Sequence, residues 1–262
     1  MTKAIQQAAD LVATARSVVV LSGAGMSAES GVPTFRDAQT GMWERFVPEQ
    51  LATESAFRAN PALVWTWYMW RWHLVNSVMP NAGHNAIGHW QQHLAANHGT
   101  LTVATQNVDD LHERGGATDV LHLHGSLGAF RCIDCHRAAA FSPGVLDYKP
   151  RQNFDDENLL TPVACQHCAT GVLRPAVVWF GEALPQETFQ KAIDQLRTAE
   201  LVVVIGSSGL VQPAASLPLI GRDAGCMLIE INPSPTELSR SADVHLASTA
   251  AVALPLLVAK IV

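Results

Sequence analysis

Short apolar runs alternate with stretches typical of helices along most of the chain. Helices are predicted near the N-terminus, where the stretch is amphipathic, between Pro61 and Pro80, and at 84–97, 185–199 and 214–223. This alternation predicts an α/β fold with a doubly wound parallel sheet, whose ligands lie at the carboxyl ends of the strands. The apolar runs expected to form its strands lie at 17–21, 101–105, 120–123, 176–180, 201–205, 227–231 and 244–246.

Three segments depart from this alternation. Residues 38–59 are polar and predict an irregular region. The helix that follows Asn60 carries tryptophans on nearly every face, which indicates that it is buried or lies over a pocket. Between Arg131 and Gly171, cysteines, prolines and polar residues replace the apolar periodicity, which predicts a separate small module.

Composition narrows the possible functions. The 262 residues are 48% hydrophobic and 15% charged, as expected for a globular chain with a sizeable core. A formal net charge of −6 argues against a general nucleic-acid or membrane-surface binder. There is neither a signal-peptide pattern nor an apolar run long enough to span a membrane, so we expect a cytoplasmic protein without nucleic-acid or membrane partners.

Four of the five cysteines form two C-x-x-C pairs, Cys132 with Cys135 and Cys165 with Cys168. Two such pairs can supply four thiolates to a tetrahedral Zn²⁺ and leave no position open for water. Incidental pairs or redox dithiols are the alternative. Because the intervening segment cannot build an apolar core of its own, we expect a structural zinc site.

A glycine-rich turn follows the first expected strand. Gly23, Gly25 and Ala28 fit the dinucleotide-binding pattern G-x-G-x-x-G/A, which places a pyrophosphate at a helix N-terminus. The rest of that fingerprint is missing, because no acidic residue ends a second strand about 20 residues on. Pro33 also ends the helix within two turns. A tight turn without a ligand is the alternative.

Polar loops follow three further strands and are expected to converge on the same sheet edge. They begin at Gln106, His124 and Gly206. His124 can act as a general base, although most histidines are simply satisfied by hydrogen bonds. Asn107 and Asp109 can reach a carboxamide or a ribose, and ordinary turn chemistry is the alternative.

The segments GAGMSAESGVPTFRD, TQNVDDLH, LHGS, the paired C-x-x-C module, VVWFGE, GSSGLVQPAA and INPSPTE occur in this order. In this arrangement the chain resembles the sirtuins, the NAD-dependent protein deacylases. The resemblance implies a Rossmann-like NAD-binding domain of residues 1–42, 81–127 and 174–262. A helical insertion would occupy 43–80 and a zinc-binding module 128–173. NAD and an acyl-lysine peptide or protein would meet between the larger and the smaller domain. We expect the protein to be a monomer.

The resemblance also assigns roles to individual residues. His124 would be the catalytic base, with Asn107 beside it at the nicotinamide ribose. The residues Val177, Val178, Trp179, Phe180 and Gly181 would pair by backbone with the substrate peptide. The residues expected to bind NAD are Gly23, Ala24, Gly25, Ser27, Ala28, Glu29, Phe35, Arg36, Gln106, Asn107, Asp109, Gly206, Ser207, Ser208, Asn232 and Ala250.

The implied reaction consumes NAD and is not a hydride transfer. The acyl oxygen attacks C1′ of the nicotinamide ribose, and nicotinamide leaves. His124 then accepts a proton through the ribose hydroxyls, and water completes the transfer. The products are free lysine, nicotinamide and O-acyl-ADP-ribose.

Tyr68 and Arg71 project from one face of the tryptophan-rich helix. An arginine can bind a carboxylate through two parallel hydrogen bonds, and a tyrosine hydroxyl can add a third. An arginine reaching solvent beside a core tyrosine is the alternative. The Tyr-x-x-Arg pattern resembles the sirtuin subfamily that removes acidic acyl groups, and Ala52 would leave room for the longer tail. We therefore expect preferred removal of succinyl, malonyl or glutaryl groups, with some deacetylation.

Other functions fit parts of the same pattern. A plain NAD-dependent lysine deacetylase is the nearest alternative. An ADP-ribosyltransferase would share the displacement of nicotinamide. A non-catalytic NAD- or zinc-binding module is opposed by the joint presence of Asn107, Asp109 and His124.

Overall fold

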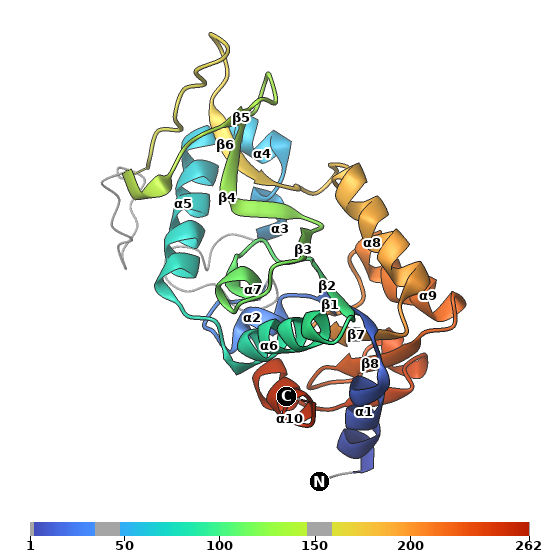
Figure 1. The fold of residues 1–262 in the computed structure, drawn as a ribbon. Helices are drawn as coiled ribbons and strands as arrows, with labels where there is room; N and C mark the ends of the chain where they lie inside the picture. Colours follow the sequence, from blue (N-terminus) through green and yellow to red (C-terminus); the bar gives the residue numbers. More distant parts are fainter. Residues whose placement is uncertain (1–2, 35–47, 146–158, 262) are drawn as a thin grey trace. The chain divides into compact units, whose positions relative to one another are not determined.

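The computed structural model describes residues 3–34, 48–145 and 159–261 (Figure 1). The chain forms two compact units. Unit 1 comprises Met1–Thr34, Met79–Leu123 and Pro185–Val262, and unit 2 comprises Phe35–Val78 and His124–Leu184. The division into three parts expected from the resemblance stays a prediction.

Unit 1 is built on a six-stranded sheet in the order β3-β2-β1-β7-β8-β9. Every neighbouring pair is parallel, which confirms the predicted doubly wound α/β fold. All six strands therefore end at the same side of the sheet, which we call the carboxyl edge. The strands are β1 (Ser17–Ser22), β2 (Thr100–Thr105), β3 (Val120–His122), β7 (Leu201–Ile205), β8 (Met227–Ile231) and β9 (Val244–Leu246).

Helices cover both faces of this sheet (Figure 1). Val18 and Val20 of β1 join one apolar cluster, whereas Val19 and Leu21 join the other, because successive side chains point to opposite faces. The first cluster packs under α1 (Lys3–Thr14), α6 (Ala82–Ala96) and α10 (Ala250–Val258). The second packs under α8 (Gln186–Thr198) and α9 (Leu217–Asp223). Short elements complete the unit: α2 (Gly25–Ala28), α7 (Leu111–Arg114), η4 (Ala214–Ser216) and η5 (Glu237–Arg240).

Unit 2 contains a three-stranded antiparallel sheet in the order β5-β4-β6. The expected tryptophan-rich helix is α5 (Pro61–Ser77), and the side chain of Asn60 accepts a hydrogen bond from the Leu63 amide at 3.1 Å. Helix α5 packs against β4, where the rings of Trp65 and Phe130 lie 5.8 Å apart. The other elements are α3 (Pro48–Leu51), α4 (Glu54–Ala59), β4 (Gly125–Cys132), β5 (Ala138–Ala139), η2 (Pro143–Val145) and β6 (Leu173–Val177).

Two details differ from the sequence-based expectation. The region 38–59, predicted to be irregular, contains α3 and α4, while 38–47 lie outside the described residues. Helix α4 has a local start signal, because the Thr53 hydroxyl accepts a hydrogen bond from the Ala56 amide at 3.1 Å. The strand predicted at 176–180 instead runs Leu173–Val177 and includes Arg174, which breaks the apolar run in the sequence.

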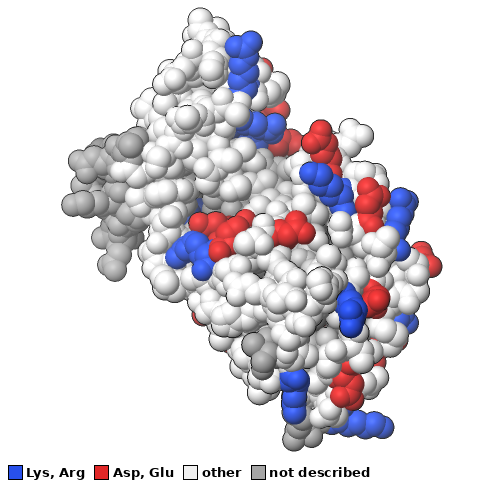
Figure 2. All heavy atoms as spheres, in the orientation of Figure 1, with Lys and Arg blue, Asp and Glu red and all other residues white. Residues whose placement is uncertain are grey.

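Surface charges and helix lengths agree with the composition. On the face drawn in Figure 2, lysine and arginine side chains lie interspersed with aspartate and glutamate, without a broad basic patch on its described part. Among the described residues, no helix is both long enough and apolar enough to cross a membrane.

Candidate functional site

Two glycine loops touch each other at the carboxyl edge of unit 1. The Gly23 amide donates to the carbonyl of Ile205 and the Gly25 amide to that of Gly206, both at 2.9 Å. A Cβ on Gly25 would lie 2.7 Å from the Cα of Gly206, and Gly206 itself has a φ of 58°. Only glycines allow this approach. The loop after β1 therefore presents bare backbone at the edge, as a pyrophosphate requires.

The helix after this turn is short. Helix α2 spans only Gly25–Ala28, in agreement with the expectation that Pro33 cuts it off early. A single turn carries only a weak macrodipole. The amides of Gly23, Gly25, Met26 and Ser27 already donate to carbonyls of the protein, so the turn offers a phosphate a close backbone approach rather than these four donors.

A polar cluster joins the loops after β1 and β2. The Ser27 hydroxyl donates to Asp109 Oδ2 at 3.0 Å and accepts from Asn107 Nδ2 at 3.1 Å. Burial raises the pKa of Asp109, against hydrogen bonds from the Leu111 amide and Ser27 that lower it. Three of the residues predicted to bind NAD are thus brought together.

Two buried histidines lie behind this cluster. His84 Nε2 lies 3.5 Å from Ser27 Oγ, and His112 Nε2 lies 2.8 Å from Ser22 Oγ. Burial lowers the pKa of His84 to about 4 and that of His112 well below its usual value. Both rings are therefore neutral near pH 7. Neither histidine was predicted as a site residue, because a histidine on an apolar face has no sequence signal of its own.

A second group of predicted residues meets where β2, β7 and β8 end. Gln106 Nε2 donates to Ser207 Oγ at 3.2 Å, and Asn232 Nδ2 donates to the carbonyl of Ser207 at 2.8 Å. A cavity of about 190 Å³ opens at this edge, and Gln106 and Ser207 line it together with Leu21 and Val204. Ser208 follows on the same loop, so the edge combines an opening with polar groups that suit a nucleotide.

Glu29 has a structural role at the same edge. Its carboxylate accepts a hydrogen bond at 2.9 Å from the Ala251 amide, in the first turn of α10. Such a carboxylate stabilises a helix start. Ala250, predicted to bind NAD, is buried at this start. Beside it, the Thr249 hydroxyl is buried and has no partner among the described residues, a feature that the sequence analysis missed.

Three predicted residues cannot be placed in this cluster. Phe35 and Arg36 lie outside the described residues. His124 directly precedes β4 in unit 2, where its carbonyl accepts a hydrogen bond from the Val178 amide at 2.8 Å. The joint action of His124 and Asn107 stays a prediction.

Unit 2 contains all of the residues predicted to bind the acylated peptide. Tyr68 and Arg71 of α5 are only 4% and 5% exposed, so Arg71 does not extend into solvent. The Arg71 guanidinium lies over the ring of Trp67, 5.2 Å from its centroid. Trp179 Nε1 donates to the Tyr68 hydroxyl at 2.7 Å. We call these four residues, together with the buried Ala52, the Arg71 cluster.

The segment after β6 is held in place by hydrogen bonds that its backbone amides donate. Phe180 donates its amide to the carbonyl of Ala52 at 2.9 Å, and Trp179 donates its amide to Glu182 Oε2 at 2.8 Å. Arg174, 2% exposed, forms an ion pair with Glu182 and lies over the ring of Trp179. Arg174 and Glu182 thus hold Trp179, and the hydrogen bond from Phe180 places Ala52 beside the segment predicted to bind peptide.

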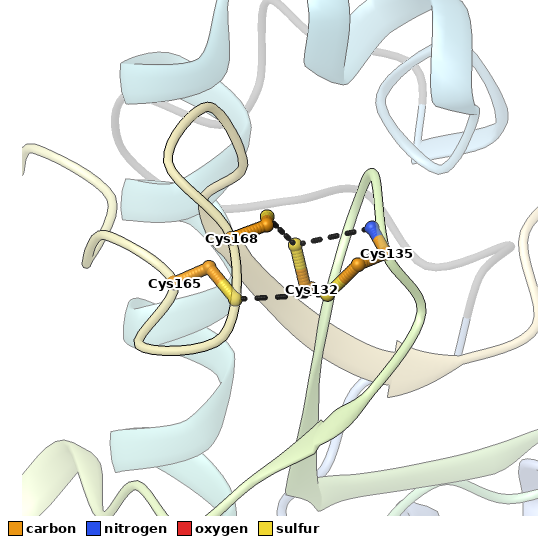
Figure 3. Close-up of side chains that lie close together, drawn as sticks. All are labelled: Cys132, Cys135, Cys165 and Cys168. Atoms are coloured by element: carbon orange, nitrogen blue, oxygen red, sulfur yellow. Dashed lines mark hydrogen bonds between the residues drawn. The ribbon is translucent and has the colours of Figure 1, made fainter.

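The four paired cysteines form one cluster, at the end of β4, in the loop that follows it and in the loop before β6 (Figure 3). The sulfurs of Cys132 and Cys168 lie 3.6 Å apart, and those of Cys135 and Cys165 lie 3.7 Å apart. A tetrahedral zinc with Zn–S bonds of about 2.3 Å spaces its sulfurs by about 3.8 Å, whereas a disulfide needs about 2.0 Å.

Backbone groups support this metal centre. The amides of Asp134 and Cys135 both point at Cys132 Sγ at 3.4 Å, and the His167 amide points at Cys165 Sγ at 3.2 Å. Such donors stabilise thiolates. The residues fit the predicted structural zinc, with all four tetrahedral positions filled by protein.

Comparisons with known proteins agree with this geometry. The sequence profile of the Sir2 family matches residues 23–213. An NAD-dependent protein deacylase of Mycobacterium leprae is 47% identical over 91% of this chain and 94% of its own length. One of Corynebacterium glutamicum is 43% identical over 98% of this chain and 96% of its own.

Solved structures show the same likeness. The crystal structure of a Sir2 homolog–NAD complex superposes with a TM-score of 0.84 at 39% identity, covering 98% of this chain and 93% of that one. The structure of Sir2Af2 bound to a myristoylated histone peptide superposes with a TM-score of 0.75 at 32% identity, covering 100% and 97%.

Proposed function

The chain belongs to the Sir2 family and is an NAD-dependent protein deacylase, and we propose that it prefers lysines carrying acidic acyl groups. Succinyl, malonyl and glutaryl lysine would be the favoured substrates, with slower removal of acetyl groups. The observation that carries this proposal is the burial of Arg71 next to the Tyr68 hydroxyl.

Tyr68 is prepared to donate a hydrogen bond. A hydroxyl has one hydrogen and two lone pairs, and one lone pair is taken by the indole N–H of Trp179. Burial raises the pKa of Tyr68 well above its usual value, although that hydrogen bond and the charge of Arg71 lower it. The hydroxyl therefore keeps its proton and can direct it to a carboxylate.

Arg71 supplies the charge for the same carboxylate. Its guanidinium stays protonated at physiological pH and presents a planar fork that suits two carboxylate oxygens. The ring of Trp67 covers one face of the guanidinium, and a carboxylate would bind along its edge. The small side chain of the buried Ala52 would leave room for a longer acyl tail.

In unit 1 the nicotinamide end of NAD would lie against Asn107, Ser27 and Asp109. NAD supplies the electrophilic C1′ of its ribose. The buried Asp109 carboxylate would stabilise positive charge that develops there, because such a group is strongest where water is excluded. His124 would accept the proton from the ribose hydroxyls.

The peptide would add by backbone near Gly181. The amides of Val178, Trp179 and Phe180 already donate within unit 2, so a peptide would use other backbone groups of this segment. Zinc would be held by the four cysteines and would stabilise the loops of unit 2 without a part in the reaction.

The test compares Arg71→Met with the parent on succinyl- and acetyl-lysine peptides in the presence of NAD. Losing charge-assisted hydrogen bonds of about 3 kcal/mol in total should lower kcat/KM for the succinyl peptide about 100-fold. Removal of acetyl should change little. Tyr68→Phe should give a smaller loss in the same direction.

Arg197→Met is the matched control, because Arg197 is an exposed arginine on α8 in unit 1. It should leave both substrates unaffected. An equal loss on both peptides in Arg71→Met, or a parent enzyme that prefers acetyl lysine, would contradict the preference for acidic acyl groups.

A further inference from the structure

Each ring nitrogen of His122, at the end of β3, lies within hydrogen-bond distance of an acceptor oxygen. Its Nε2 lies 2.6 Å from Glu113 Oε1 on α7, and its Nδ1 lies 3.3 Å from the carbonyl of Asn107. A carboxylate and a carbonyl can only accept hydrogen bonds, so both ring nitrogens must donate. A histidine that donates from both nitrogens is an imidazolium cation.

We propose that the His122–Glu113 ion pair is a positioning device that fixes the Asn107 loop for the nicotinamide end of NAD. This inference rests on the proposed function, which places nicotinamide against that loop. His122 would touch neither NAD nor peptide and would act through Asn107.

The Asn107 backbone and side chain are held from several directions. Its amide donates to Thr105 Oγ1 at 3.0 Å and its side chain donates to Ser27 at 3.1 Å. The carbonyl has His122 as its partner. A neutral His122 carries one N–H and could serve only one of its two acceptors, so losing the proton releases either Asn107 or Glu113.

The surroundings favour the charged ring. Burial lowers the pKa of His122, but Glu113, the Asn107 carbonyl and Asp109 raise it more, so the net shift is upward. Burial raises the pKa of Glu113, but His122 and the more distant His84 lower it more, so the net shift is downward. The two shifts have the directions expected for an ion pair.

The charged and titratable groups on the neighbouring elements are paired, neutral or exposed. On α7, Arg114 forms an ion pair with Asp110 at 3.5 Å. His112 is neutral, because burial and neighbouring histidines lower its pKa. Helix α8 contacts β3 and brings Phe189 and Ile193 to the shared apolar cluster. Its charged residues Glu187, Lys191, Asp194 and Arg197 are exposed. The Thr105 residue of β2, in register with His122, is uncharged.

The test measures binding of NAD and of ADP-ribose by calorimetry to the parent, His122→Gln and Glu113→Gln, at pH 6 and pH 8. ADP-ribose lacks nicotinamide and serves as the matched ligand. His122→Gln should bind NAD about 10-fold more weakly at both pH values, the effect of one hydrogen bond to a charged group. Its affinity for ADP-ribose should change less than about 2-fold.

Glu113→Gln should show a weaker pH dependence. Without the carboxylate His122 loses its proton at a lower pH, and the neutral ring can then carry its hydrogen on either nitrogen. This variant should therefore bind NAD like the parent at pH 6 and about 3-fold more weakly at pH 8, where only part of the molecules donate from Nδ1 to Asn107. The Glu113 side chain is 40% exposed, so this substitution should leave the fold intact. His89→Gln, on the exposed side of α6, is the control and should match the parent.

Unchanged NAD affinity in both variants, or equal losses of NAD and ADP-ribose, would overturn the inference. The measurement needs no acyl transfer. A chain that binds NAD through His122 but removes no acyl group would therefore refute the proposed function and leave this inference standing.

Discussion

The carboxyl edge of unit 1 and the Arg71 cluster of unit 2 are built from opposite kinds of residue. The edge consists of glycines and short polar side chains, such as Ser27 and Asn107, whose positions follow from the register of a parallel sheet. The cluster consists of long side chains, Trp67, Tyr68 and Arg71, with Trp179 from a distant segment. Backbone geometry therefore determines the first site, and side-chain packing determines the second. The two sites should respond to different substitutions.

Removing the zinc should have the largest effect on activity. It should disrupt unit 2 and leave unit 1 intact. Cys165→Ser removes one of four ligands, so we expect the loops of unit 2 to lose their order and deacylation to fall at least about 100-fold. Metal analysis and a deacylation assay measure this. Unit 1 should still bind ADP-ribose. Full activity in a variant without zinc would contradict a structural metal.

Gly206→Ala should have the opposite pattern, with unit 1 impaired and the zinc site of unit 2 intact. The new Cβ would lie 2.5 Å from the backbone nitrogen of Met26, at a φ that L-residues rarely adopt. We expect ADP-ribose affinity to fall about 100-fold, with full zinc content. Gly128→Ala in unit 2 is the control, because among the described residues its Cβ would meet only Ser126 Oγ, at 3.6 Å. ADP-ribose binding at the parent's level in Gly206→Ala would refute the role of the touching loops.

Trp179→Phe should affect mainly the enzyme's discrimination between succinyl and acetyl lysine. It keeps an aromatic ring but removes the N–H that orients the Tyr68 hydroxyl. The preference for succinyl over acetyl lysine should fall about 5-fold, the effect of one hydrogen bond. A double-mutant cycle with Tyr68→Phe checks this. The combined loss should be smaller than the product of the single losses, and independent losses would argue against the coupling.

The smallest expected effect is the pH dependence of stability from the His122–Glu113 pair. The pKa of His122 is raised on folding, so its contribution is complete below about pH 6.5 and is lost as pH rises through the folded pKa. The pKa of Glu113 is lowered, so its contribution is present above about pH 4.3 and is lost at lower pH.

Urea unfolding of the parent and of Glu113→Gln tests this window. The pair is partly exposed, so the difference in unfolding free energy should be below about 1 kcal/mol. It should be present at pH 5.5 and smaller at pH 9. A difference that grows toward pH 9 would have the wrong sign for an imidazolium–carboxylate pair.

The sequence was most informative where local pattern determines structure. The strands predicted at 201–205, 227–231 and 244–246 are present with those bounds, because uninterrupted aliphatic runs are typical of buried parallel strands. The glycine turn and the cysteine pairs were also readable. Their chemistry depends on residue type and spacing within one segment or two matching ones.

The sequence was least informative where distant residues complete a group. Strand β6 was displaced in the prediction, because Arg174 is buried by Glu182 and Trp179, which follow it in the chain. Nothing in the sequence links Trp179 to Tyr68, or His122 to Glu113 and Asn107. Such contacts depend on how the elements pack.

The most direct test of the account is a stoichiometric assay. Succinyl- and acetyl-lysine peptides would be incubated with the enzyme, with and without NAD, and nicotinamide, free lysine peptide and acyl-ADP-ribose measured by mass spectrometry. The account predicts one nicotinamide released for each acyl group removed, faster with the succinyl peptide, and no removal without NAD. Acyl removal in the absence of NAD would contradict it.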